Sequence, residues 1–260
     1  MATDPYTAPR SRVADVPAAG AEGAFSADAR PVPAGHGWTW IADGCELFKR
    51  QPGTWILLLI VFVLISVVVA LIPVLGSIAS NLLWPVFAGG VMLGCRELAQ
   101  GGELAVGHLF AGFRDHFGKL VVIGILYLVA LIAIVMVAFM ITGAGIGFGA
   151  MMGGDRGGAE MGLSAILLTV LIVLALIVPV VMAMWFAPGL VVLNDLGVGD
   201  AIRASFRACL RNVVPFLVYG AIGLGLAIVA SIPFGLGWLV LGPTLVGSVY
   251  AAYRDIFYAG

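Results

Sequence analysis

Charged residues are scarce in this sequence. Asp, Glu, Lys and Arg together make up 10% of its 260 residues, whereas hydrophobic residues make up 62%. A soluble globular domain carries about 25% charged residues, so the composition excludes that class and indicates a protein solvated by lipid. The net charge of -1 gives no electrostatic reason to expect a nucleic-acid partner.

Residues and motifs that carry chemistry are equally rare. The three cysteines, Cys45, Cys95 and Cys209, are far apart and have no Cys-x-x-Cys spacing, which predicts reduced thiols. The chain has neither a Gly-x-Ser-x-Gly nor a His-Glu-x-x-His motif. We therefore expect no enzymatic activity, no cofactor and no bound metal.

The N-terminal region, residues 1–36, is rich in Pro, Ala and Gly and has no apolar run. It lacks the apolar core that a secretory signal peptide requires. This composition predicts a disordered cytoplasmic tail, which is followed by a membrane domain at residues 37–257.

Long segments without charged residues or histidine fill most of that domain. Each is long enough to cross a bilayer, which takes about 20 residues. The six segments are residues 54–72, 75–95, 120–142, 164–193, 213–234 and 236–253. If the N-terminus is inside, every Lys and Arg except Arg156 falls on the inner side. Because cytoplasmic loops are enriched in Lys and Arg, we expect both termini in the cytoplasm and the chain in the inner membrane.

A stretch of the second segment is repeated in the last one. WPVFAGGVMLGCRE, Trp84–Glu97, aligns without a gap to GPTLVGSVYAAYRD, Gly242–Asp255. The two copies share a proline, small residues and an Arg-acid pair in the same register. A looser third copy lies in the fourth segment, around WFAPG. The three prolines predict helix kinks, since proline lacks the amide that an interior turn needs; they are Pro85, Pro188 and Pro243.

Small residues four positions apart accompany the aligned prolines. The pairs are Gly90 with Gly94, and Ser248 with Ala252. Such pairs let helix backbones approach closely. They predict helix packing within the chain, with a dimer interface as the alternative.

A short amphipathic stretch precedes each pair of apolar segments. The clearest is DAIRASFRACLRN, in which Arg203, Arg207 and Arg211 recur every four residues beside an apolar stripe. A helix of this kind lies in the membrane interface with its guanidinium groups at the phosphates. Arg96 and Arg254 end their spans at the same inner boundary, where arginine reaches headgroups and pairs with nearby acids. All five arginines are predicted to contact lipid headgroups, anionic ones in particular.

The sequence thus predicts an all-α membrane protein. Its six transmembrane helices form three hairpins, each preceded by a cytoplasmic amphipathic elbow helix. The favoured function is a non-enzymatic scaffold, or a protein that interacts with lipids, with partner proteins or with copies of itself. A channel or transporter for a small, weakly charged solute is the alternative, because kinked, Gly-rich helices are suited to lining a path.

Several stretches also resemble a known group of proteins. They are GWTWIADGCELFKRQPGTWI (37–56), WFAPGLVVLND (185–195), ASFRACLRNVVPFLVYG (204–220) and YRDIF (253–257). These stretches look like the uncharacterised six-helix membrane proteins of proteobacteria, and the likeness covers residues 37–257. More loosely, the chain is similar to the membrane domain attached to some bacterial glycerophosphodiester phosphodiesterases. The resemblance implies a fold, and it implies no activity because the phosphodiesterase domain is absent.

Overall fold

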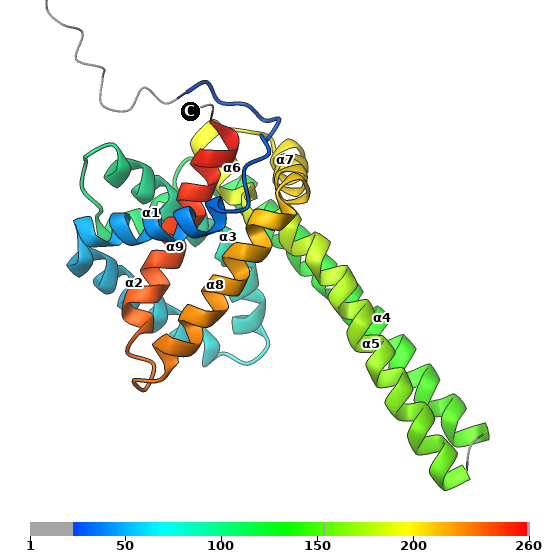
Figure 1. Ribbon diagram of the computed structural model, residues 1–260. Coiled ribbons are helices and arrows are strands. Elements are labelled where there is room, and N and C mark those ends of the chain that lie inside the picture. Colours follow the sequence, from blue (N-terminus) through cyan, green and yellow to red (C-terminus); the bar gives the residue numbers. More distant parts are fainter. Residues whose placement is uncertain (1–22, 153, 259–260) are drawn as a thin grey trace, which may run out of the picture.

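The computed structural model describes residues 23–152 and 154–258, and places most of them in helices (Figure 1). In chain order the helices are α1 (His36–Arg50), α2 (Pro52–Ala70), α3 (Leu75–Ala99), η1 (Val106–Phe113), α4 (Phe117–Met152), α5 (Gly154–Trp185), α6 (Ala187–Asn194), α7 (Val198–Arg211), α8 (Val213–Ser231) and α9 (Trp238–Phe257). The described residues contain a single isolated β-bridge, between Phe25 and Tyr258, and no strand. The predicted all-α class is therefore confirmed.

Five segments of the described chain are long and apolar enough to cross a membrane. They are Pro52–Ala70, Leu75–Ala99, Phe117–Ala144, Leu163–Asn194 and Val213–Ser231. These correspond to the first five predicted spans within a few residues. Helix is the natural conformation there, because a backbone in lipid must satisfy its polar groups internally. The sixth predicted span, α9, is not among them, since it carries Thr, Ser and Tyr residues and ends in an Arg-Asp pair.

The helices are arranged with two distinct ends. Figure 1 shows α1, α6, α7 and the C-terminal end of α9 gathered at one end of the bundle. The turns that follow α2 and α8 lie at the other end. The long α4 and α5 pack along each other and extend away from the bundle as an arm (Figure 1). Within the arm, a hydrogen bond of 2.8 Å between the hydroxyls of Thr142 and Thr169 links α4 to α5.

Helix α1 runs across α8 and α9 at very close range. A Cβ added to Gly44 would lie 2.5 Å from the amide nitrogen of Ser248, and still closer to the carbonyl oxygen of Thr244. A Cβ added to Gly37 would lie 2.7 Å from the amide nitrogen of Tyr219 on α8. Glycine is therefore required where α1 meets both helices.

The small residues predicted to pack helices all lie at contacts within this chain. Gly90 faces η1, where an added Cβ would lie 3.0 Å from the carbonyl oxygen of Leu109. Gly94 faces the side chains of Leu104 and His108. Ser248 and Ala252 are buried on α9, the helix that α1 crosses.

Residues 23–35 depart from the predicted disordered tail. Ala29 is buried, and the amides of Ser26 and Arg30 donate hydrogen bonds to the carbonyls of Phe257 and Ile256 at 2.9 and 3.0 Å. The prediction of disorder is wrong for this segment, which we call the strap (residues 23–35). The remainder of the predicted tail, residues 1–22, lies outside the described residues.

Candidate functional site

Helix α7, which carries the predicted arginine stripe, has one buried face and one exposed face. Its small residues are buried against α5 and α6; they are Ala201, Ala204, Ser205, Ala208 and Cys209. Arg203 and Arg207 project outward, with 74% and 53% of their side chains exposed. Ile202, Phe206 and Leu210 form an adjacent apolar row, in which the first two are half-buried and Leu210 is 57% exposed. A row of arginines beside a row of apolar side chains is suited to the boundary between headgroups and acyl chains.

The three arginines of the stripe differ in how firmly they are bonded to the rest of the protein. Among the described residues, Arg203 makes one long ion pair, with Asp200 at 3.9 Å. Arg207 lies 3.4 Å from the carboxylate of Asp28 in the strap. Arg211 donates to the carbonyl of Ala29 at 2.9 Å, so it holds the strap in place. Arg203 and Arg207 are therefore the members of the stripe best placed to meet a headgroup.

Arg96 and Arg254 do not make the predicted pairs with the acids next to them. Arg96 donates to the carbonyl of Leu193, near the end of α6, at 3.4 Å. Arg254 lines a polar cavity of about 870 Å³ between α1, α9 and the strap, together with Asp43 and Glu46. Burial raises the pKa of the Asp43 carboxyl, and the nearby acids add to the effect. No ion pair links Arg96 to Glu97 or Arg254 to Asp255 among the described residues.

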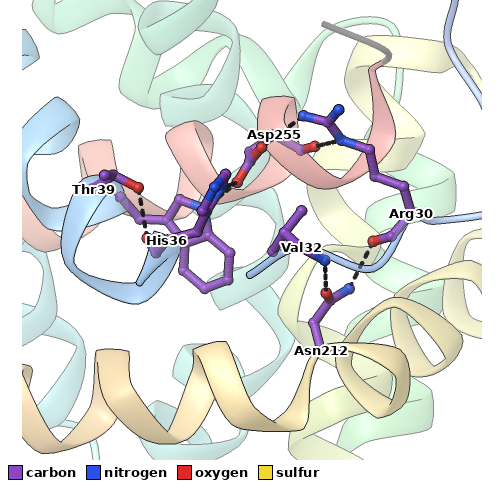
Figure 2. Close-up of polar contacts among 7 residues, drawn as sticks. Arg30, Val32, His36, Thr39, Asn212 and Asp255 are labelled. Atoms are coloured by element: carbon purple, nitrogen blue, oxygen red, sulfur yellow. Dashed lines mark hydrogen bonds and ion pairs between the residues drawn. The ribbon is translucent and has the colours of Figure 1, made fainter. Parts of the chain in front are cut away.

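Asp255 is instead the centre of a polar cluster that joins the strap to α1 and α9 (Figure 2). Its carboxylate accepts hydrogen bonds from the Arg30 guanidinium at 2.8 Å, the His36 Nδ1 at 2.7 Å and the Trp40 Nε1 at 2.8 Å. Burial alone would raise the pKa of Asp255. The bonds from His36, Trp40 and Arg30 outweigh burial and hold that pKa below its usual range.

Asn212 fastens the other side of the strap. Its Oδ1 accepts from the amide of Val32 at 2.8 Å, and its Nδ2 donates to the carbonyl of Arg30 at 3.0 Å (Figure 2). Asn212 is fully buried at the junction of α7 and α8. The sequence analysis missed both Asn212 and His36, although an Asn that directly follows an amphipathic helix was a usable signal.

The predicted proline kinks fall into two kinds. Pro85 and Pro243 lie inside α3 and α9. Pro188 lies in the first turn of α6, directly after a break at Phe186 that interrupts the segment Leu163–Asn194. At the break, the Ser205 hydroxyl accepts from the amide of Phe186 at 3.0 Å and donates to the carbonyl of Met182 at 2.7 Å. Ser205 thus stands where a helical hydrogen bond would run, which is a known cause of helix breaks.

All three prolines line one apolar cavity of about 480 Å³. Three tryptophans, Trp55, Trp84 and Trp185, line it as well. The sequence predicted the prolines but could not show that they face a common space. No group of three or more His, Cys, Asp or Glu side chains that could hold a metal ion occurs in the part of the chain that the structure describes.

Comparison with known proteins identifies a relative that matches most of the chain. The chain is 32% identical over 254 residues to a probable inner membrane protein of Burkholderia thailandensis, and the match covers 87% of this chain and 92% of that protein. No protein-family model matches the sequence, and no solved structure matches it. The looser resemblance to glycerophosphodiester phosphodiesterases therefore has no support.

Proposed function

Since this multi-pass membrane protein belongs to the family of the probable inner membrane protein of Burkholderia thailandensis, we propose that it is a non-enzymatic inner-membrane protein that binds anionic lipids at its cytoplasmic rim. By cytoplasmic rim we mean the exposed face of α7. The observation that carries the proposal is the pair of exposed arginines, Arg203 and Arg207, beside the apolar row of the same helix.

A six-span topology is part of this proposal, with α9 as the last span. The strap and the end of α9 are bonded together, so residue 23 and residue 258 lie at the same end of the molecule. An even number of crossings accounts for that arrangement. The polar residues of α9 are tolerable in a span because many of them, such as Thr244 and Ser248, face protein.

The helices further suggest three units closed into a ring. The units are α1–α3, η1–α6 and α7–α9. Helix η1 packs on α3, α7 packs on α5 and α6, and α1 packs on α9. Each elbow helix thus rests on the last long helix of the preceding unit, and the first elbow completes the circle. This arrangement supports the predicted repeat of an elbow and a hairpin.

Reporter fusions test the topology. A fluorescent protein that folds only in the cytoplasm, fused after residue 260, is expected to fluoresce, and a fusion at the N-terminus is expected to do the same. Insertion of the same reporter in the turn after α8, at residues 232–237, is expected to give no fluorescence. A dark C-terminal fusion beside a bright N-terminal one would show that α9 does not cross.

Removing the arginines tests lipid binding. The double variant Arg203→Gln and Arg207→Gln is expected to bind short-chain phosphatidylglycerol about 30-fold more weakly, because each basic residue near a surface contributes about 1 kcal/mol. The measurement is a titration of the purified full-length protein in neutral detergent. Phosphatidylcholine provides the zwitterionic comparison.

The matched control is Arg114→Gln, an exposed arginine outside α7. It is expected to bind phosphatidylglycerol like the wild type. Equal affinities in all three proteins, or an equal loss for both lipids in the double variant, would contradict headgroup binding by α7.

A channel or transporter receives less support from the geometry. The cavity between the prolines is lined by apolar side chains, and Tyr127 is the only ionisable residue in the described lining. Ion and proton paths through membranes normally carry acids, bases or histidines. A hydrated route would have to lie elsewhere in the molecule.

A further inference from the structure

The apolar cavity lies inside the part of the protein that lipid surrounds. Its walls come from α2, α3, α4, α5 and α9, and α6 and η1 add residues at one side. Four of these helices are among the five candidate spans. At about 480 Å³ the cavity is within the range of ligand sites, roughly 300 to 1,000 Å³.

The chemistry of the walls selects an apolar occupant. Leucine, valine, methionine, proline and aromatic side chains make up most of the lining. A water molecule needs two to four polar partners, and cavities without them stay dry. A hydrocarbon chain has no polar groups to satisfy, so burying it here costs no hydrogen bonds.

The cavity is closed at one side and open at another. Its floor is made by Trp55, Leu109 and Ile123, which are at most 1% exposed. Its mouth includes Trp84, at 56% exposure, and Val246, at 39%. These exposed side chains belong to the apolar outer surface of the spans, so the mouth is continuous with the surface that lipid chains cover.

The wall of the cavity has a gap between two of the helices that line it. Helices α5 and α9 both line the cavity, yet close packing between them is absent among the described residues. Trp185 of α5 instead meets the rings of Phe216 and Tyr219 on α8 at 5.8 and 6.3 Å. Through Trp185, α5 therefore packs on α8 rather than on α9.

We propose that this cavity holds a fatty-acyl chain of a membrane lipid, which enters between α5 and α9. The inference deepens the proposed function, because it names an acyl site within a lipid-binding protein. It does not depend on the arginines of α7, since an acyl chain is bound by the walls alone. Prolines 85 and 243, inside α3 and α9, and Pro188, in the first turn of α6, all contribute to its walls.

Filling the cavity tests the proposal. Ala88→Phe and Val246→Phe each add an aromatic ring to the lining, at two different positions. The matched control is Ala133→Phe, at a lipid-exposed position of α4 that is not part of the lining. Two filling variants are used so that a folding defect in one does not decide the result.

Quenching of tryptophan fluorescence reports on the occupant. Three exposed tryptophans, namely Trp38, Trp84 and Trp238, are first replaced by Phe in every protein compared, including the wild-type reference. Trp84 lies at the mouth of the cavity, so all these proteins share the same change there. The protein is then reconstituted in phosphatidylcholine with brominated acyl chains, which quench only nearby rings. Trp55 and Trp185 line the cavity, so a chain inside it is expected to quench their emission.

Each filling variant is expected to lose about half of this quenching, because the chain no longer has a void to enter. Ala133→Phe is expected to retain the wild-type level. Native mass spectrometry should show the same loss as about one fewer retained lipid per chain. Equal quenching and equal lipid retention in all variants would overturn the proposal, as would an unquenched wild type.

The outcome is separable from that of the headgroup experiment. Phosphatidylcholine is zwitterionic, so quenching by its chains does not require Arg203 or Arg207. If the double arginine variant binds phosphatidylglycerol normally while the filling variants lose quenching, headgroup binding by α7 is contradicted and the acyl-chain site is supported. The reverse pattern would remove the acyl site alone.

Discussion

Replacing Gly44 with leucine is expected to prevent the protein from folding. The position has no room for a side chain, because an added Cβ would meet backbone atoms of Thr244 and Ser248 rather than the ends of flexible side chains. Backbone atoms inside α9 can move only together with the whole helix, so a side chain at this position would push α1 and α9 apart. Since α1 also carries His36 and Trp40, its displacement would separate the whole Asp255 cluster. We expect a loss of about 4 kcal/mol or more.

The measurement is the yield and melting temperature of the protein in detergent, followed by size exclusion. The matched control is Gly53→Leu in the first turn of α2, where nothing lies within 4 Å of an added Cβ. Leucine is a better helix former than glycine, so Gly53→Leu is expected to fold normally or to be slightly more stable. A Gly44→Leu protein with wild-type yield and melting temperature would contradict the close crossing of α1 and α9.

The spans could be predicted because membrane helices are defined by composition. Five predicted segments recur as long apolar helices, and most of their ends agree within a few residues because charges or Pro-Gly turns mark the boundaries. Helices α4 and α5 continue about ten residues beyond the predicted ends, to Met152 and from Gly154. Helix α9 does not recur among the candidate spans, since its polar residues lower its hydropathy. A sixth crossing is therefore proposed from its length without charges and from the position of its end beside the strap.

The strap could not be predicted because its stability comes from distant partners. Its composition of Pro, Ala and Gly is typical of disordered chain. What orders it is Asp255, 225 residues from Arg30, and Asn212, 180 residues from Val32. No local pattern contains information about contacts at that separation.

Only part of the candidate site could be predicted, because its geometry also depends on contacts between distant segments. The repeat identified Pro85 and Pro243, and the third copy identified Pro188, but a shared cavity is a property of three helices packed together. Ser205 was missed because its role depends on the broken turn of a neighbouring helix. On a helical wheel it is only a polar residue on the small face of α7.

Replacing Asp255 with asparagine is expected to release the strap. Asparagine keeps the shape of the side chain but lacks the negative charge of the carboxylate, which both Arg30 and His36 contact. Hydrogen bonds to a charged group contribute about 1.5 to 3 kcal/mol, so the opening of the strap should become about 30-fold more frequent. The measurement is hydrogen exchange at residues 23–35, where the amides of Ser26 and Arg30 are bonded to the end of α9.

The matched control is Glu97→Gln, because Glu97 aligns with Asp255 in the repeat yet is exposed. It is expected to leave exchange in the strap unchanged.

Acid should reproduce the effect of Asp255→Asn, because the pKa of Asp255 is lowered in the folded protein. The stabilisation by its carboxylate is complete above the unfolded pKa of about 3.9, and it is lost as the pH falls through the folded pKa. Protection of the wild-type strap should therefore fall only below about pH 4. In Asp255→Asn this dependence should be absent, and equal protection in the two proteins at neutral pH would show that the backbone bonds and Asn212 hold the strap without the carboxylate.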